Sequence, residues 1–127
     1  MKKVLIVDDV KGWREQHYMI LREMLPDDTV YEFASSAREA YEIVYNNINQ
    51  PFDLIITDLQ MEEDFSPKYA GEWFVEQVKL LSQYAKTRIV IISATYNIRL
   101  IAEGYGVHYL SKSNASKFPQ SYIDVIL

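Results

Sequence analysis

The stretch Val4-Leu-Ile-Val-Asp-Asp9 joins four apolar residues directly to two carboxylates. Two similar runs occur further along the chain, Leu54-Ile-Ile-Thr57 before Asp58 and Ile89-Val-Ile-Ile92 before Ser93. Short runs of apolar, β-branched residues are typical of strands that helices cover on both faces. The three runs therefore predict central strands of a parallel sheet, with polar residues at their carboxyl ends.

Two further segments predict the edges of that sheet. Thr29 to Ala34 and Val107 to Leu110 mix apolar with polar residues, as strands with one exposed side do. Five strands alternating with five helical patterns indicate a doubly wound α/β fold, because right-handed crossovers place helices on both faces. If the second strand lies outside the first, the order is 2-1-3-4-5, which is the flavodoxin-like order.

The helical patterns have recognisable ends. The first stops at Pro26, and the second opens with a capping box of Ser36 and Glu39. A short fourth pattern ends at Gly104, and the last begins near Pro119. The residues that we expect to face inward are Trp13, His17, Ile20, Leu21, Met24, Ala37, Ala40, Tyr41, Val44, Ile48, Phe74, Val78, Leu81, Ala85, Tyr122, Ile123 and Ile126.

Composition narrows the functional classes. The chain has 127 residues, no cysteine and a formal net charge of −5. This size predicts one domain, residues 1–127, and the absence of cysteine excludes thiol catalysis, zinc knuckles and disulfide frameworks. The acidic balance repels nucleic-acid phosphates, and the apolar runs are too short to cross a bilayer. We therefore expect a cytoplasmic protein that binds neither nucleic acid nor membranes.

Three carboxylates define a candidate metal site. Asp8 and Asp9 follow the first strand and Asp58 follows the third, so the predicted strand order brings them into one crevice. Together they would repel one another, and Mg²⁺ suits two carboxylates, waters and a phosphate oxygen. The alternative is that each aspartate only caps a loop or helix, which is natural for one aspartate but less so for three at adjacent strand ends.

Two further polar side chains point to phosphoryl chemistry. Ser93 ends the fourth strand and Lys112 lies at the end of the fifth, so both are expected in the same crevice. A hydroxyl donor and a compact cation opposite three carboxylates are what a transferred phosphoryl group requires. Each residue alone would be an ordinary loop hydroxyl or a solvated lysine. Their positions at the ends of adjacent strands favour the functional interpretation.

With these motifs in order, the sequence resembles the receiver domains of the two-component response regulator family, and is similar to the single-domain chemotaxis regulator. The resemblance covers nearly the whole chain. It rests on four motifs, Val4-Leu-Ile-Val-Asp-Asp9, Leu54-Ile-Ile-Thr-Asp-Leu-Gln-Met61, Ile91-Ile-Ser-Ala94 and Tyr109-Leu-Ser-Lys112. It implies the flavodoxin-like receiver fold and a signalling domain that phosphorylates and dephosphorylates itself without a turnover substrate.

The resemblance assigns roles in phosphoryl transfer. It implies that Asp58 is the phosphoacceptor, and that Asp8, Asp9 and Asp58 bind Mg²⁺ with a main-chain carbonyl from Gln60. Lys112 would contact the phosphoryl group. The implied phosphodonor is a sensor histidine kinase or a histidine phosphotransfer protein, and the downstream protein target is unknown.

The resemblance also assigns a switch. Ser93 would be the switch hydroxyl, and Tyr109 the aromatic residue that turns inward or outward with it. Gln60 and Thr95 stand at the positions that tune attack by water on the phosphorylated aspartate. The surface that changes would bind a partner, and a homodimer is one of the assemblies it could form.

Three departures from the family pattern bear on function. Ser113 follows Lys112 where the family usually has a proline in a cis peptide, which predicts a less rigidly aimed lysine. The segment 59–70 is several residues longer than usual, and we read it as an acidic lid or a partner-contact loop, or else as a tolerated insertion. The interval from Ser93 to Tyr109 is shorter by roughly one helical turn, which predicts a shortened fourth helix.

Two alternative functions remain open, and the departures suggest the first of them. The first is a receiver-like module that binds proteins without phosphorylation. The second is a Mg²⁺-dependent phosphohydrolase of haloacid dehalogenase type, which also forms an aspartyl phosphate. That class places its nucleophile two residues before a second aspartate, whereas Asp8 and Asp9 are adjacent, so the sequence disfavours it.

Overall fold

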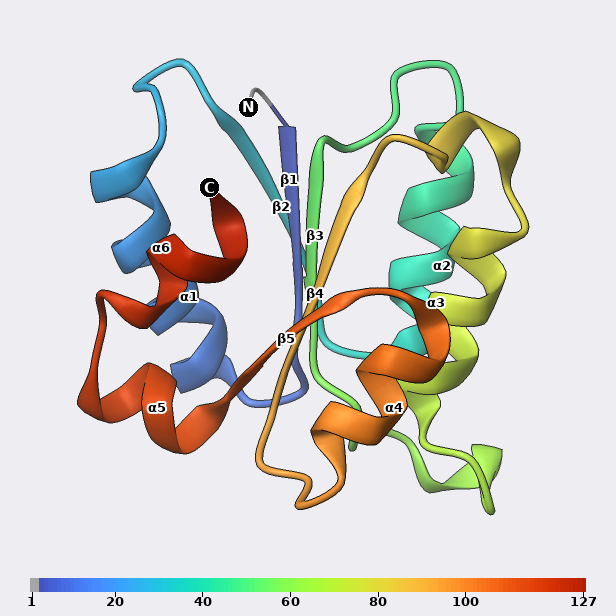
Figure 1. Ribbon diagram of the computed structural model, residues 1–127. Coiled ribbons are helices and arrows are strands. Elements are labelled where there is room, and N and C mark those ends of the chain that lie inside the picture. Colours follow the sequence, from blue (N-terminus) through green and yellow to red (C-terminus); the bar gives the residue numbers. More distant parts are fainter. Residues whose placement is uncertain (1–2) are drawn as a thin grey trace.

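Five parallel strands form one sheet in the computed structural model, which describes residues 3–127 (Figure 1). The strands are β1 (Lys3–Val7), β2 (Val30–Ala34), β3 (Leu54–Thr57), β4 (Arg88–Ser93) and β5 (His108–Ser111). Their order is β2-β1-β3-β4-β5, so the predicted doubly wound fold and both predicted edge strands are confirmed.

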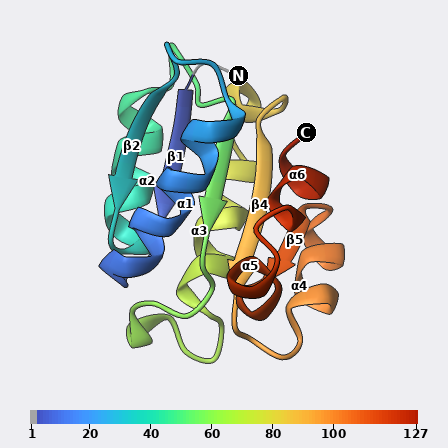
Figure 2. The ribbon, with the colours of Figure 1, turned by 90° about the vertical axis from the view of Figure 1, so that its left-hand side faces the viewer.

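Helices cover both faces of this sheet. On one face lie α2 (Ala37–Asn46), α3 (Ala70–Lys79) and α4 (Ile98–Tyr105), and on the other lie α1 (Lys11–Met24), α5 (Lys112–Lys117) and α6 (Ser121–Ile126) (Figure 1). Figure 2 looks onto the second face, where α1 packs on β1 and α6 on β4 and β5. Two 3₁₀ turns, η1 (Glu63–Phe65) and η2 (Ser82–Tyr84), flank α3.

The three central strands are buried on both faces, which explains why their sequences are continuously apolar. Successive residues alternate between the two cores. In β1, for example, Leu5 and Val7 pack beneath α2 and α3, whereas Val4 and Ile6 pack beneath α1 and α6. All four side chains are fully buried.

Some helix ends differ from those that the sequence predicts. The fourth helix does not end at Gly104, because Gly106 supplies the left-handed cap with φ 68° and Tyr105 remains helical. The eight-residue α4 agrees with the predicted short helix. Ile48 lies beyond the end of α2. Ala85 lies beyond α3 and is exposed, so its predicted inward position is wrong.

The C-terminal region contains one helix more than expected. α5 begins immediately after β5, because the Ser111 side chain accepts a hydrogen bond from the Asn114 amide at 3.1 Å. The chain leaves α5 at Phe118 and re-enters a helix at Ser121. In α6, Tyr122 and Ile126 are buried as predicted, but Ile123 is 46% exposed.

Strand register brings the functional strand ends to one edge of the sheet. Val7 pairs with Thr57, Thr57 with Ile91, and Ser93 with Ser111. The residues that follow these strands therefore meet at the lower edge in Figure 1. Within residues 3–127, no helix has the length and apolar character needed to cross a bilayer.

Candidate functional site

Backbone hydrogen bonds fix the two aspartates at the strand ends. The Asp8 amide donates to the Ala34 carbonyl at 3.1 Å, and the Asp58 amide donates to the Val7 carbonyl at 3.0 Å. The sheet ladder thus continues one residue past β1 and β3. Both side chains are buried, as the predicted crevice between neighbouring strands requires.

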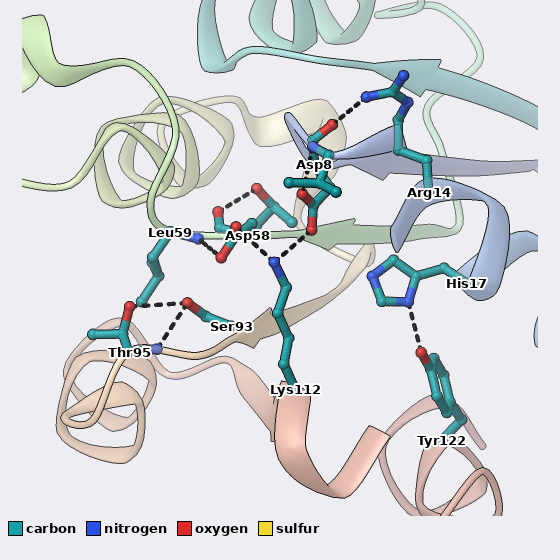
Figure 3. A network of polar contacts seen from close by, with 11 residues as sticks. Asp8, Arg14, His17, Asp58, Leu59, Ser93, Thr95, Lys112 and Tyr122 are labelled. Atoms are coloured by element: carbon teal, nitrogen blue, oxygen red, sulfur yellow. Dashed lines mark hydrogen bonds and ion pairs between the residues drawn. The ribbon is translucent and has the colours of Figure 1, made fainter. Parts of the chain in front are cut away.

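Lys112 bridges these two carboxylates (Figure 3). Its Nζ atom lies 3.0 Å from Oδ2 of Asp8 and 3.0 Å from Oδ2 of Asp58. The same ammonium lies 5.1 Å from the centre of the Trp13 ring, within the range of a cation–π contact. These contacts hold Lys112 in place although Ser113, rather than a proline, follows it.

The electrostatics of the bridge follow from burial and charge. Burial raises the pKa of Asp8, and the hydrogen bond from the Val10 amide opposes this rise. Burial also disfavours the charged form of Lys112, but the Asp58 and Asp8 carboxylates outweigh it and raise the lysine pKa. The ammonium therefore stays protonated and partly neutralises two acids that would otherwise repel each other.

The acidic cluster fits a hard divalent cation. Asp8, Asp9 and Asp58 each offer a carboxylate oxygen, and these oxygens lie within 4.8 Å of one another. Oδ2 of Asp8 is buried and lies 3.0 Å from the Lys112 ammonium, and no hydrogen bond from another described residue reaches it, which leaves a lone pair of this oxygen for a metal. Carboxylate oxygens are the ligands that Mg²⁺ prefers. Gln60, whose main-chain carbonyl is the fourth predicted ligand, is an exposed residue.

The two carboxylate oxygens of Asp58 have different partners. Its Oδ1 accepts the Leu59 amide hydrogen at 2.7 Å, and its carbonyl accepts the Thr57 hydroxyl at 2.8 Å. Its Oδ2 is the atom next to Lys112. The carboxylate is thereby fixed in orientation, with Oδ2 at the ammonium.

The two predicted switch residues, Ser93 and Tyr109, lie on β4 and β5. The Ser93 hydroxyl is buried and lies 2.9 Å from the Thr95 hydroxyl, and it accepts the Thr95 amide hydrogen at 3.2 Å (Figure 3). Tyr109 is 36% exposed on the edge strand β5. In this state Ser93 is paired with Thr95 and Tyr109 is turned outward.

Sequence reasoning missed three residues that shape the site. Gly71 in α3 faces the strand end so closely that a Cβ there would lie 2.1 Å from the Asp58 carbonyl oxygen. Arg14 donates to the Asp8 carbonyl at 2.7 Å, and Trp13 lies by Lys112. The Gly71 contact joins segments far apart in sequence, so no local pattern announces it. For Trp13 and Arg14 the signal was their position shortly after the paired aspartates.

His17 is a structural residue in this arrangement. His17 is buried on α1, and its Nδ1 shares a 2.7 Å hydrogen bond with the Tyr122 hydroxyl. Burial, reinforced by the Lys112 charge, lowers the His17 pKa to about 3. His17 therefore stays neutral near pH 7 and ties α1 to α6 behind the site.

Comparison with solved structures identifies the fold. The chain matches CheY4, a chemotaxis response regulator of Vibrio cholerae, at 27% identity and a TM-score of 0.71, covering 99% of each chain. The protein thus has the fold of CheY-like response regulator receiver domains. No protein-family model matches the sequence, and no curated protein is significantly similar to it.

Two other similar structures show receiver domains with ligands or partners. The Ssk1 receiver domain of Saccharomyces cerevisiae, in complex with the histidine phosphotransfer protein Ypd1, is 21% identical, with 98% of this chain and 88% of that chain covered and a TM-score of 0.70. The response regulator Rcp1 in its Mn²⁺-bound form is 18% identical, with 98% and 89% covered and a TM-score of 0.72.

Proposed function

We propose that the protein is a phosphoacceptor receiver of a two-component phosphorelay, in which Asp58 takes a phosphoryl group from a histidine kinase or a histidine phosphotransfer protein. The observation that carries this proposal is the position of the Lys112 ammonium, 3.0 Å from both Asp8 and Asp58, in the crevice where β1 and β3 end. A nucleophile, a fixed cation and a metal-competent acid cluster share that crevice.

The side chains suit an in-line transfer. Asp58 Oδ2 forms a bond to the phosphorus of a donor phosphohistidine as the phosphorus–nitrogen bond breaks, and the histidine keeps that electron pair. Lys112 stabilises negative charge on the transferred oxygens. The Leu59 amide holds the other Asp58 oxygen and so limits rotation of the carboxylate. A divalent cation held by Asp8, Asp9 and Asp58 would supply further charge neutralisation when bound.

Switching follows from competition for the Ser93 hydroxyl. The aspartyl phosphate adds roughly −1.5 to −2 charge and three acceptor oxygens, by analogy with other phosphorylated side chains. We propose that this charge draws Ser93 away from Thr95 and that Tyr109 then turns inward. Gln60 and Thr95 would tune hydrolysis, and neither is a strong general base, so the proposed dephosphorylation is slow.

The proposal extends to partners. The complex of Ssk1 with Ypd1 is a precedent for docking of a histidine phosphotransfer protein on a receiver fold. We propose a cytoplasmic protein that signals by binding an unidentified protein, with a homodimer as one further assembly. It would have no turnover substrate of its own.

The direct test is chemical phosphorylation. The protein is incubated with acetyl phosphate and Mg²⁺, and intact mass and peptide fragmentation are measured. We expect a mass gain of one phosphoryl group on Asp58 that is lost in Asp58→Asn. Asp27→Asn is the matched control, because Asp27 is an exposed aspartate in the loop before β2, at the opposite edge of the sheet.

Three results would contradict the proposal. Absence of a mass gain in the wild-type protein, with folding confirmed by circular dichroism, would favour a binding module that works without phosphate. Labelling that persists in Asp58→Asn would move the phosphoacceptor to another residue. Sustained release of phosphate from an ester would instead indicate a phosphohydrolase.

A further inference from the structure

A basic pocket lies at the edge of the sheet opposite the acidic crevice. Its volume is about 310 Å³, and the charged or titratable side chains lining it are Lys79, Lys86, Arg88 and His108. No acidic residue is among its lining residues. In a chain of net charge −5, these side chains form a local excess of positive charge, which favours an anion.

The fold gathers these residues from three elements. Lys79 ends α3, Arg88 begins β4 and His108 begins β5, while Lys86 lies in the turn before β4. Ser93 lies five residues after Arg88 along β4, which corresponds to about 17 Å along an extended strand. The pocket is therefore distinct from the crevice at Asp58, and the inference does not rest on the proposed function.

The cations of the pocket have no carboxylate partner among the described residues. Elsewhere in the described part of the chain, five lysine and arginine side chains form ion pairs with acids, among them Arg38 with Asp64 and Lys68 with Glu76. Among residues 3–127, Lys79, Lys86 and Arg88 form no ion pair. Three unpaired cations around one hollow repel each other, and an anion would relieve that repulsion.

Arg88 is held in position rather than free to swing. Its Nη1 lies 3.0 Å from Nε2 of His108 and 3.2 Å from the Val125 carbonyl oxygen. An arginine can only donate, so His108 Nε2 is the acceptor and its proton lies on Nδ1. The guanidinium is thus oriented by two contacts through one nitrogen, and its other nitrogens make no hydrogen bond within residues 3–127.

We propose that this pocket is a second ligand site, which binds a small multiply charged oxyanion of the phosphate class. A fixed guanidinium with two ammonium groups matches the geometry and charge of such an anion. The pocket is lined by no Phe, Tyr or Trp side chain, so it lacks a large aromatic surface for stacking a nucleobase. The pocket would therefore recognise the phosphate groups themselves, and pyrophosphate is a representative ligand.

The test uses amide chemical shifts of the full chain. Pyrophosphate is titrated in metal-free buffer at constant ionic strength, which removes chelation at the acidic crevice and general screening. We expect saturable shifts at the amides of Thr87, Arg88, Val107 and His108. Loss of one charge-assisted contact in Lys86→Gln or Arg88→Gln should weaken binding about tenfold.

Control variants separate a built site from general attraction. Lys117→Gln removes an exposed lysine of α5 and should leave the affinity unchanged. Lys79→Gln tests the pocket without touching the Arg88 contact to Val125, in case Arg88→Gln is poorly folded. Shifts that do not saturate, shifts that spread equally over all lysines, or shifts centred on Asp58 and Lys112 would each overturn the proposal.

Discussion

The Nζ atom of Lys112 lies 3.0 Å from Oδ2 of Asp58, so the cation that would stabilise a transferred phosphoryl group already contacts the oxygen that would attack it. The same nitrogen is equally close to Asp8. One lysine therefore neutralises two buried acids in the unphosphorylated protein. Lys112 therefore stabilises the unphosphorylated protein, and it can contact a transferred phosphoryl group without a large movement.

Removing that cation should destabilise the protein. Lys112→Ala leaves Asp8 and Asp58 without their counterion, and we expect the free energy of unfolding in metal-free buffer to fall by about 3 kcal/mol. Mg²⁺ should then stabilise the variant more than it stabilises the wild type. Urea unfolding with and without Mg²⁺ measures both effects. Lys117→Ala is the control, and an unchanged stability of Lys112→Ala would contradict the electrostatic role.

Gly71 should be irreplaceable for a steric reason. In Gly71→Ala the new Cβ would meet the Asp58 carbonyl oxygen at 2.1 Å and the Leu59 Cα at 2.6 Å. Backbone atoms cannot move aside without straining the fold, so we expect the free energy of unfolding to fall by about 1–3 kcal/mol. Phosphorylation of Asp58 should also be slower.

Gly104→Ala is the matched control for that substitution. Gly104 lies inside α4, and a Cβ there has no heavy atom within 4 Å. Alanine should therefore stabilise the helix by roughly 0.5–1 kcal/mol. Thermal unfolding of the two variants should shift in opposite directions, and equal shifts would show that the close approach at Gly71 does not matter.

Glu62 should anchor the long β3–α3 loop. Its carboxylate accepts hydrogen bonds from the Ala37 amide at 2.8 Å and the Arg38 amide at 3.2 Å, at the start of α2. We expect Glu62→Ala to cost about 1 kcal/mol of stability. Hydrogen exchange at the Ala37 and Arg38 amides should accelerate.

The neighbouring Glu63 provides the comparison for that loop. Its side chain is exposed and forms no ion pair among the described residues. Glu63→Ala should therefore leave stability within about 0.5 kcal/mol of the wild type. If both variants exchange at the same rate, the Glu62 contact does not hold the loop.

His17 should make stability depend on pH. Burial lowers its pKa from 6.5 to about 3 in the folded protein, so between these values the unfolded chain binds a proton that the folded chain does not. The contribution is present above pH 6.5 and is lost as the pH falls, at up to about 1.4 kcal/mol per pH unit.

Urea unfolding between pH 7 and pH 5 checks this slope. His17→Gln should remove most of the decline at lower pH, because glutamine does not titrate. His108→Gln, at an exposed position, should leave most of the decline in place. An identical pH profile for wild type and His17→Gln would refute the role of the buried imidazole.

The sequence predicted the fold best where a residue pattern has a single structural explanation. Continuous apolar runs occur where helices cover both faces of a strand, so the central strands and the acids that follow them could be placed from sequence. The contacts of Gly71 and Glu62 could not, because each joins segments that are local neighbours only after folding. Ile123 was misassigned because the sequence does not show that α6 covers the sheet with a narrow face.

The brevity of α5 sets how far a pull on Lys112 can travel. The lysine is the first residue of a six-residue helix, about 1.7 turns long, that ends before Phe118. A displacement of the ammonium therefore acts on the first residue of α5, and the chain is no longer helical at Phe118, just after the other end of this short helix. We expect the motion to be absorbed as a tilt of α5. The signal of a fluorescent reporter at the exposed Phe118 should therefore change on phosphorylation, while that of a reporter at the exposed Ile123 of α6 should not.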